Sequence, residues 1–350
     1  MKIVVLAGGL SPERDVSLSS GSLIANALRR TGHKVLLLDV YEGIAGEIRD
    51  PDKLFKDHTG EPYTYSVPEV QPDLHGIKSK NQNCEALVGS NVVSLCKSAD
   101  LVFIALHGAM GENGQIQAFF DVLGIKYTGT GYIGCLLAMD KDIAKRLMCQ
   151  SGIPTAEWII FKDSMSPQSI IDRIGLPCVV KPCSAGSSIG VSIATNMDQL
   201  IKAIDDAMNI EHRVIIEKLV RGREFSVGIL NGDALPVIEI KPKTGFYNYK
   251  NKYQKGMTDE NCPANLPKSD TVRVQNLAIM VHRTLQLGPY SRIDFIQNTE
   301  GEFICLEANT LPGMTPTSLL PQEALAAGIT YEELCNRIIR SAVCTNTPFL

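Results

Sequence analysis

The sequence lacks any hydrophobic run long enough to cross a membrane. None of its apolar stretches approaches the roughly 20 residues that span a bilayer. The apolar start, Ile3 to Ala7, is too short for the hydrophobic part of a signal peptide, and the acids Glu13 and Asp15 follow it without a small-residue cleavage site. We therefore expect a cytoplasmic protein that is neither secreted nor embedded in a membrane.

An excess of basic residues is missing as well. The 350 residues include 34 lysines and arginines against 38 aspartates and glutamates, which gives a net charge of −4. A protein that binds nucleic acid normally presents a basic surface to the phosphate backbone. Nucleic acid is therefore not an expected partner.

The ten cysteines show no metal-binding or disulfide pattern. None forms a CxxC pair, and none is grouped with histidines. Scattered cysteines in a long chain are more typical of reduced thiols than of a disulfide framework. Cys178, Cys305 and Cys335 lie in apolar segments, so we predict that they are core residues rather than zinc ligands.

No GxxxxGK[ST] loop is present, so a nucleotide would have to be held by something other than a Walker A motif. The candidate is the segment from Lys181 to Gly190, where a lysine at the end of a predicted buried strand precedes a serine- and glycine-rich loop. Free backbone amides in such a loop can bind phosphate oxygens. A plain hairpin turn is the alternative, and Lys141, at a predicted helix start, is uninformative by itself.

The elements that are present predict a protein of mixed α/β and α+β class. A βαβ unit opens the chain, with strands at 2–7 and 34–38 around a helix at 16–30. The segment 42–98 is polar and is predicted to be a surface excursion without an assigned role. Helices are also expected at 115–123 and 271–287, and strands at 101–106, 158–161, 178–182, 191–194, 213–218, 224–230, 235–240, 291–296 and 302–308.

Local signals also predict helix starts and strand pairing. The patterns Thr195-x-x-Asp198 and Thr330-x-x-Glu333 are typical of helix caps. The three strands between residues 213 and 240 follow one another with short turns, which predicts an antiparallel meander.

The first predicted strand ends in Gly8 and Gly9, with Ser11, Glu13 and Ser17 at the start of the helix that follows. Backbone amides at a helix N-terminus favour a small anionic or polar ligand. This turn lacks the GxGxxG pattern of a dinucleotide site, so an ordinary βα turn is the simpler interpretation.

Polar residues end two strands near the C-terminus. Arg292 and Asp294 share one face of the first strand, and Glu307 and Asn309 alternate in phase at the end of the second. If the strands pair, the four side chains converge. Their hard oxygen ligands suit Mg²⁺, and no histidine points to zinc. A solvated sheet face is the alternative, but acids at the ends of otherwise buried strands favour a site.

An aromatic and basic loop occupies residues 245–253, with the sequence GFYNYKNKY. It could close over a charged ligand and exclude water. An ordinary surface cluster of tyrosines explains the composition equally well.

Eight segments in unbroken order resemble the D-alanine:D-alanine ligase family: GGLSPERDVSLSSG, ALHGAMGENGQIQ, MDK, VVKPCSAGSSIGVS, IEKLVRGREFSVGIL, FYNYKNKY, SRIDF and LEANTLPGMTPTSLLP. The resemblance covers nearly the whole chain. It implies an ATP-grasp fold with a Rossmann-like parallel α/β domain at 1–134, a small α+β domain at 135–218 and a domain built on an antiparallel sheet at 219–350. ATP is expected between the last two domains.

The resemblance also implies roles for single residues. The nucleotide would be bound by Lys141, Lys181, Glu217, Lys218, Val220, Glu224 and Lys252, and two Mg²⁺ ions, with Mn²⁺ as a possible substitute, by Asp294, Glu307 and Asn309. Glu13 would hold the first D-alanine's ammonium and hydrogen-bond onward to Ser187 and Tyr253, with His107 beside this subsite. The second D-alanine would meet Arg292, the Gly313 backbone, Ser318 and Leu319.

The implied reaction is the ATP-dependent ligation of two D-alanines through a D-alanyl phosphate, for peptidoglycan precursors, by a cytoplasmic homodimer. Two residues depart from the family pattern: Thr317 replaces a common histidine, and Asp15 replaces a commoner glutamate. Tyr253 follows Lys252 as in dipeptide-forming members. A D-serine or D-lactate ligase of the glycopeptide-resistance type, another carboxylate–amine ligase and a catalytically silent nucleotide-binding regulator are the alternatives.

Overall fold

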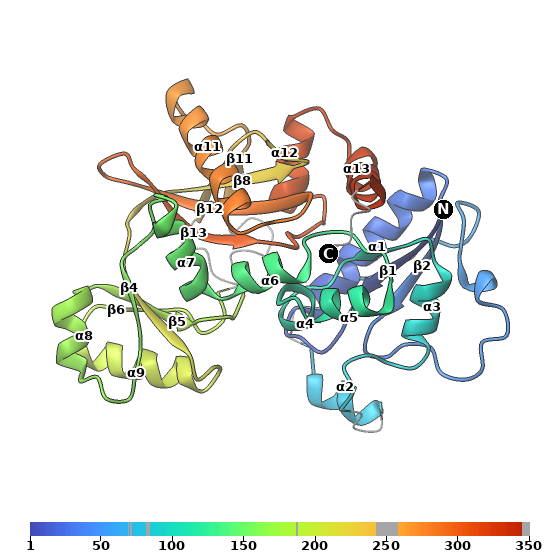
Figure 1. Ribbon diagram of the computed structural model, residues 1–350, viewed down its shortest axis with the longest axis horizontal. Helices are drawn as coiled ribbons and strands as arrows, with labels where there is room; N and C mark the ends of the chain where they lie inside the picture. The colour runs from blue at the N-terminus through green and yellow to red at the C-terminus, as the bar shows by residue number, and fades with distance from the viewer. Residues whose placement is uncertain (69, 71, 82–84, 187, 243–257, 345–350) are drawn as a thin grey trace.

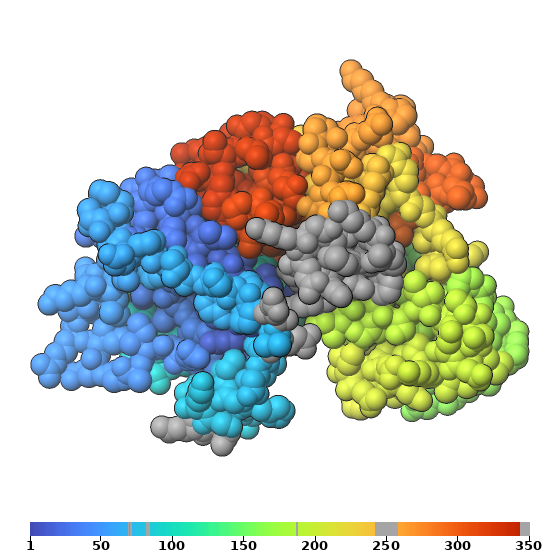
Figure 2. Space-filling view, turned by 180° about the vertical axis from the view of Figure 1, so that it is seen from behind, coloured from blue at the N-terminus to red at the C-terminus, as the bar shows by residue number. Residues whose placement is uncertain are grey.

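The computed structural model describes residues 1–68, 70, 72–81, 85–186, 188–242 and 258–344. Three β-sheets with their helices follow one another along the chain (Figure 1). Seen from behind, the N-terminal part, in blue, and the central part, in yellow-green, lie on two sides of the molecule, with the C-terminal part in orange and red above them (Figure 2). Within the described residues, no helix is both long and apolar enough to cross a membrane.

The first sheet is parallel, with strand order β2-β1-β3. It consists of β1 (Lys2–Ala7), β2 (Lys34–Asp39) and β3 (Leu101–Ile104). The helix α1 (Arg14–Arg30) connects β1 to β2. The strands are runs of valine, leucine and isoleucine because both faces of a parallel sheet are covered. Gly21 lets α1 pack closely, since a Cβ there would lie 2.8 Å from the Cβ of Ala7. The predicted βαβ opening is confirmed.

The segment 42–98 contains the 3₁₀ helix η1 (Pro51–Leu54), α2 (Leu74–Lys80) and α3 (Val92–Ser98). Side chains of α1 hold its middle part in place. Arg29 donates to the carbonyl oxygens of Asp57 at 2.6 Å and Glu61 at 3.0 Å, and Asn26 exchanges two hydrogen bonds with the backbone of Tyr63. The buried side chains of α3 join the core of the first sheet. This excursion is therefore anchored to the helix whose N-terminus carries Glu13.

Four helices lead to the second sheet: α4 (Ala109–Glu112), α5 (Gln115–Leu123), α6 (Tyr132–Met139) and α7 (Lys141–Gln150). This sheet is antiparallel, with the order β4-β7-β5-β6. Its strands are β4 (Trp158–Ile160), β5 (Cys178–Pro182), β6 (Ser192–Ala194) and β7 (Val214–Lys218), and it packs against α8 (Pro167–Ile174) and α9 (Met197–Met208).

Two predictions about this region are wrong. Residues 214–218 do not begin a meander with the next two strands, because β7 pairs with β4 and β5 in the second sheet. The helix α9 is capped by Asn196, whose side chain accepts the amide of Gln199, and not by Thr195, whose hydroxyl bonds to the Gln199 side chain. Asparagine caps a helix as well as threonine does, and the two stand side by side in the sequence.

The third sheet is antiparallel, with the order β11-β10-β8-β12-β13 and β9 paired to β8. Its core face packs against α11 (Lys268–Thr284), through side chains such as Phe225, Ile293 and Phe295. Asp294 lies on the opposite face of the sheet, away from this core. The strands are β8 (Gly222–Leu230), β9 (Asp233–Ala234), β10 (Ile238–Pro242), β11 (Thr258–Asn261), β12 (Tyr290–Asn298) and β13 (Phe303–Asn309).

The chain then returns to the first sheet. After β13 come α12 (Leu319–Ala326) and α13 (Tyr331–Cys344), and α13 packs against α1. Leu334 and Ile338 belong to the same core as the first sheet. The predicted cap is confirmed, because the hydroxyl of Thr330 accepts the amide of Glu333 at 3.3 Å.

Candidate functional site

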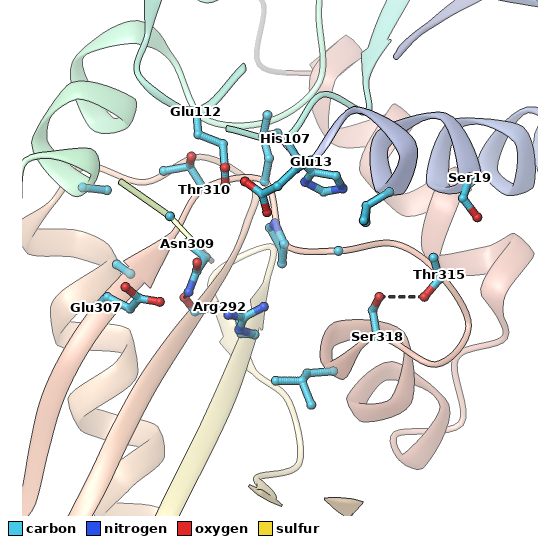
Figure 3. Close-up of a pocket in the computed structure, with 18 of the residues that line it drawn as sticks. Glu13, Ser19, His107, Glu112, Arg292, Glu307, Asn309, Thr310, Thr315 and Ser318 are labelled. Atoms are coloured by element: carbon cyan, nitrogen blue, oxygen red, sulfur yellow. Dashed lines mark hydrogen bonds between the residues drawn. The ribbon is translucent and has the colours of Figure 1, made fainter. Parts of the chain in front are cut away.

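The polar side chains predicted at the ends of two strands do converge. β12 and β13 pair antiparallel, with Arg292 opposite Asn309 and Asp294 opposite Glu307. Directly opposite residues project from the same face of a sheet. The four side chains therefore lie together, as Figure 3 shows for Arg292, Glu307 and Asn309.

A β-bulge sets the direction of Glu307. The register shifts between Asp294 and Phe295, so that Phe295 lies opposite Cys305 while Asp294 lies opposite Glu307. Cys305 is thus directed into the core with Phe295, and Glu307, only two residues later, faces the site. Bulges commonly re-aim a side chain next to a functional site in this way.

Asp294 is the centre of the hydrogen bonds in this cluster. Its Oδ1 accepts from Nε of Arg292 at 2.9 Å and from Oγ of Ser226 at 2.7 Å. Its Oδ2 accepts from Nη2 of Arg292 at 2.8 Å and from Nδ2 of Asn309 at 3.1 Å. Asp294 is 6% exposed, so Arg292 compensates the charge of a largely buried carboxylate.

The donor set suits a hard divalent cation. Two carboxylates, Asp294 and Glu307, stand directly opposite one another with the amide of Asn309 beside them. Carboxylate and amide oxygens are ligands that Mg²⁺ accepts. Each oxygen of Asp294 already accepts two hydrogen bonds, so metal binding by Asp294 requires at least one of the donors, Arg292, Ser226 or Asn309, to move.

The cluster opens into a cavity of about 550 Å³ between the N-terminal and C-terminal parts of the chain. Figure 3 shows Glu13 and His107 on one side and Arg292, Glu307 and Ser318 on the others. The described side chains that line it with polar groups include Glu13, Ser19, His107, Glu112, Lys141, Arg292, Glu307, Asn309, Thr315, Thr317 and Ser318.

Glu13 stands at the N-terminus of α1 and is 6% exposed. Two glycines make room for its carboxylate. A Cβ at Gly108, where φ is +80°, would lie 3.4 Å from Oε2 of Glu13, and a Cβ at Gly186 would lie 3.7 Å from the same oxygen. The loops after β3 and β5 therefore meet at Glu13.

Two titratable groups adjoin Glu13, the buried His107 and the half-buried Glu112. Burial lowers the pKa of His107, and the negative charge of Glu13 opposes that change only in part, so the imidazole is neutral. Burial, with repulsion from Glu13, raises the pKa of Glu112 to about 8. Glu112 accepts the amide of Gly108 at 2.8 Å and is mostly protonated at neutral pH. Glu13 is thus flanked by two groups that carry little charge.

Lys141 is the first residue of α7 and reaches the loop after β5. The preceding Asp140 caps the helix, and the Lys141 Nζ donates to the carbonyl oxygen of Ala185 at 2.7 Å. Burial lowers the pKa of this lysine, while Glu307 raises it. Lys141 therefore lies between the carboxylate cluster and the serine- and glycine-rich loop.

A buried cluster of ion pairs connects β7 and β5, the two central strands of the second sheet. Oε2 of Glu217 on β7 pairs with Nζ of Lys181 on β5 at 2.9 Å, and Oε1 pairs with Nζ of Lys145 on α7 at 3.2 Å. Lys145 is 1% exposed and also donates to Thr155 Oγ1 at 2.7 Å. The two lysines outweigh the effect of burial, so the pKa of Glu217 is lowered. Glu217 is therefore a buried carboxylate between two ammonium groups.

The other residues predicted for the nucleotide follow Glu217 along the chain. Lys218 is exposed at the end of β7, and Val220 follows it in the connection to β8. Glu224 on β8 is opposite Ile296, on the same sheet face as Ser226. These residues, like Lys181 and Glu217, are outside the lining of the cavity. Lys141 connects the two regions, because its charge interacts with both Glu307 and Glu217.

The residues predicted for the second substrate form the far wall of the cavity. Ser318 precedes α12, and its Oγ lies 2.8 Å from the Thr315 hydroxyl (Figure 3). Gly313 faces Ser318 closely, since a Cβ there would lie 2.8 Å from the Ser318 Oγ. Leu319 begins α12 and is buried. Ser187, Lys252 and Tyr253 lie outside the described residues.

Three residues of the candidate site were not predicted from the sequence. Lys145 is a buried lysine, Glu112 is a half-buried carboxyl whose pKa is raised, and Ser226 donates a hydrogen bond to Asp294. Lys145 lies one helical turn after Lys141, a spacing that signals a shared helix face. Ser226 lies two residues after Glu224, so the two share a strand face.

Comparisons with known proteins agree along the whole chain. Family models described as D-ala D-ala ligase N-terminus and C-terminus match residues 2–130 and 147–340. A D-alanine–D-alanine ligase of Pediococcus pentosaceus is 42% identical over 97% of each chain. The crystal structure of a D-alanine–D-alanine ligase from Bacillus anthracis, complexed with ATP, has a TM-score of 0.75 at 29% identity, covering 98% of this chain and 97% of that one. A D-Ala:D-Ser ligase from Enterococcus faecalis has a TM-score of 0.74 at 27% identity, covering 97% and 99%.

Proposed function

Because the chain belongs to the D-alanine–D-alanine ligase family, we propose that it uses ATP to join two D-alanine molecules into D-alanyl-D-alanine. ADP and phosphate are the other products, and the dipeptide serves peptidoglycan precursor synthesis. The observation that carries the proposal is the cavity in which Glu13, Arg292 and Glu307 face one another. This one space has an anionic group for an amine, a cationic group for a carboxylate or oxyanion, and metal ligands.

The first D-alanine is placed beside Glu13. The carboxylate of Glu13 is largely buried at the N-terminus of α1, and it binds the substrate ammonium. Neutral His107 and protonated Glu112 leave Glu13 as the main negative charge of this subsite. The resemblance adds hydrogen bonds from Glu13 to Ser187 and Tyr253.

ATP is placed along the second sheet, with its phosphates directed toward the cavity. Lys141 and Lys181 bind phosphate oxygens, Glu217, Lys218 and Val220 surround the adenine, and Glu224 binds the ribose hydroxyls. The position of Lys141 between the carboxylate cluster and the loop after β5 supports this placement. So does the ATP complex of the similar ligase from Bacillus anthracis. Lys252 is assigned to the γ-phosphate by resemblance.

Asp294, Glu307 and Asn309 are proposed to hold two Mg²⁺ ions, for which Mn²⁺ can substitute. Their cross-strand arrangement and their oxygen donors support this. Bound there, the metal neutralises the charge that develops on the transferred phosphoryl group.

In the proposed first step, a carboxylate oxygen of D-alanine attacks the γ-phosphorus. The bond from that phosphorus to the bridging oxygen breaks, which gives ADP and D-alanyl phosphate. Lys141 and Lys181 hold the phosphate oxygens in line for the transfer.

In the second step, the amine of the second D-alanine, once it has lost a proton, attacks the carbonyl carbon, and inorganic phosphate leaves. Arg292 and the Gly313 backbone stabilise the tetrahedral oxyanion, and Ser318 with Leu319 orients the incoming molecule. Water must be kept out because it would hydrolyse the acyl phosphate. By resemblance, this role is assigned to Ser187 and residues 247–253, which lie outside the described residues.

D-serine is the alternative second substrate. The similarity to the D-Ala:D-Ser ligase of Enterococcus faecalis, and Thr317 at a position where histidine is common, favour testing it. The test is product identification by mass after incubating the pure protein with ATP, Mg²⁺ and D-alanine, alone or with D-serine or D-lactate. D-alanyl-D-alanine from D-alanine alone is the expected product. A mixed product alone contradicts it, and nucleotide binding without phosphate release indicates the silent regulator.

The proposal extends to organisation and location. The ranges 1–134, 135–218 and 219–350 each contain one of the three sheets, and we propose them as the domains. Localisation in the cytoplasm is proposed from the reaction, whose nucleotide substrate is cytoplasmic.

We also propose that the protein is a homodimer. On α5 and α6 a group of large apolar side chains is exposed, which is typical of an interface between proteins. The group consists of Phe119, Val122, Tyr132, Ile133 and Leu136. Light scattering tests this. We expect the native protein to be a dimer and Leu136→Glu to be a monomer, and a monomeric native protein contradicts the proposal.

A further inference from the structure

Glu323 is a buried carboxyl group that the reaction described above does not use. It lies on α12, has an exposed fraction of 0%, and neither of its oxygens has a hydrogen-bond partner of normal geometry within the described part of the chain. Burying a polar group without such a partner is destabilising. A buried group of this kind therefore calls for an explanation.

The position of Glu323 is defined by Gly228 on β8. A Cβ at Gly228 would lie 2.4 Å from Oε2 of Glu323, so the carboxyl occupies the place of the missing side chain. In the pairing of β8 with β12, Gly228 is directly opposite Arg292. Directly opposite residues in an antiparallel pair share a face and are close neighbours. Glu323 therefore stands next to the side chain of Arg292.

The charges agree with this placement. Burial raises the pKa of Glu323; the positive charge of Arg292 opposes this rise most, Asp294 adds to it, and the Gly228 backbone amide also opposes it. Arg292 already holds the two oxygens of Asp294, so Glu323 is a second carboxyl within reach of the same guanidinium.

Arg292 meets a conflict if Asp294 binds a metal ion. The side chain of Arg292 is 12% exposed, and a cation that is nearly buried needs an anionic partner. Each oxygen of Asp294 already accepts two hydrogen bonds, one of them from Arg292, so a metal ion that binds Asp294 competes with Arg292 for these oxygens. A second carboxyl next to Arg292 resolves the conflict.

We propose that Glu323 is a positioning residue that holds the guanidinium of Arg292 when Asp294 turns to a metal ion. The proposal rests on the function given above. It also explains why α12 carries Glu323 four residues after Leu319, because the same helix then supplies both the wall of the second-substrate pocket and the support of Arg292.

The test compares Glu323→Gln and Glu323→Leu with the native protein, and uses Leu325→Gln as a control. Leu325 is on the same helix and is 67% exposed. Mn²⁺ binding is titrated by electron paramagnetic resonance in the presence of a non-hydrolysable ATP analogue, and kcat and the midpoint of thermal unfolding are measured on the same samples.

Both Glu323 variants should bind Mn²⁺ at least about tenfold more weakly, because Arg292 stays on Asp294, and kcat should fall in parallel. The unfolding midpoint of Glu323→Leu should stay the same or rise, since a buried carboxyl without a hydrogen bond of normal geometry has been removed, and that of Glu323→Gln should stay near the native value. A purely structural glutamate would give the opposite change in stability. Leu325→Gln should match the native protein.

Two results separate the possible failures. If the native protein binds Mn²⁺ and makes the dipeptide while both Glu323 variants bind Mn²⁺ equally well, the role of Glu323 is refuted and the proposed function stands. If the native protein itself binds no Mn²⁺ with the nucleotide, both proposals are refuted. A double-mutant cycle adds a third measure: in the Arg292→Lys background, Glu323→Gln should change Mn²⁺ affinity much less, and full additivity contradicts an action through Arg292.

Discussion

The guanidinium of Arg292 donates hydrogen bonds to both carboxylate oxygens of Asp294, from Nε to Oδ1 at 2.9 Å and from Nη2 to Oδ2 at 2.8 Å. A bidentate pair of this kind is strong and directional. It keeps a largely buried carboxylate compensated while no metal is bound. Asp294 therefore has two proposed partners, Arg292 and a metal ion, and the exchange between them links metal binding to the position of Arg292.

Replacing the carboxylates should abolish turnover without unfolding the protein. In Asp294→Asn and Glu307→Gln, the side chains keep their size but lose the charge that attracts a divalent cation. We expect kcat to fall at least about a hundredfold at saturating Mg²⁺, with near-native circular dichroism. Phosphate release with D-alanine measures the effect, and full activity in either variant refutes the metal assignment.

Replacing Lys145 should affect both stability and nucleotide binding. Lys145→Met leaves Glu217 with Lys181 as its remaining ion-pair partner in a buried setting. Breaking a buried pair costs about 3–5 kcal/mol, and a stronger hold of Glu217 on Lys181 should weaken ATP binding. Urea unfolding and an ATP titration measure the two effects.

The control for this variant is Lys202→Met. Lys202 is exposed on α9, so its free energy of unfolding should stay within about 0.5 kcal/mol of the native value. A Lys145→Met protein that matches this control in stability and ATP affinity shows that the buried pair contributes nothing measurable.

Glu112 should make stability depend on pH. Its pKa is about 8 in the folded protein and near the ordinary value of 4.5 when unfolded. Between these values the folded state keeps a proton that the unfolded chain has lost. The contribution of Glu112 to the free energy of unfolding is therefore largest below pH 4.5, and it is lost as the pH rises through 8.

The variant Glu112→Gln should remove this dependence, because an amide does not titrate. Relative to the native protein, it should gain stability as the pH rises from 5 to 8, by at most about 1.4 kcal/mol per pH unit. Urea unfolding across this range gives the difference. A difference that stays constant with pH is incompatible with a raised pKa at Glu112.

Tyr65 links the 42–98 excursion to the N-terminus of α1, because its hydroxyl donates to Oδ1 of the buried Asp15. Tyr65→Phe should lower the free energy of unfolding by about 1 kcal/mol, since a hydrogen bond to a charged group is lost at a partly exposed site. Val70→Ala is the control, because Val70 lies in the same segment, is 75% exposed and should change the free energy of unfolding by less than about 0.5 kcal/mol. Equal stability of Tyr65→Phe and the native protein contradicts a structural role for this contact.

Much of the fold could be predicted because its signals are local. The runs of valine and leucine at 2–7 and 34–38 and the helix between them indicate a βαβ unit without knowledge of the rest. The strands that carry Asp294 and Glu307 could be predicted from their alternation, and their pairing, which the sequence left as a condition, is present in the fold.

The sheet to which β7 belongs could not be predicted in the same way. Adjacent strands with short turns usually pair, yet β7 pairs with strands earlier in the chain, a choice made by the packing of each core. The bulge beside Asp294 was equally hidden, since strict alternation would place Cys305 and Glu307 on one face.

The candidate site was predicted least well where residues act through burial. Lys145 and Glu112 have ordinary sequence surroundings, and their properties come from desolvation by segments distant in sequence. Glu323 has the same character, because its relation to Arg292 depends on a glycine in a neighbouring strand. Such relations require the folded chain.

The most direct measurement follows oxygen-18 from the carboxylate of D-alanine during turnover with ATP and Mg²⁺. The account predicts D-alanyl-D-alanine as the product, with one labelled oxygen transferred to each inorganic phosphate, because that oxygen bridges carbon and phosphorus in D-alanyl phosphate. Unlabelled phosphate, or phosphate release that does not depend on D-alanine, would contradict the proposed ligase reaction.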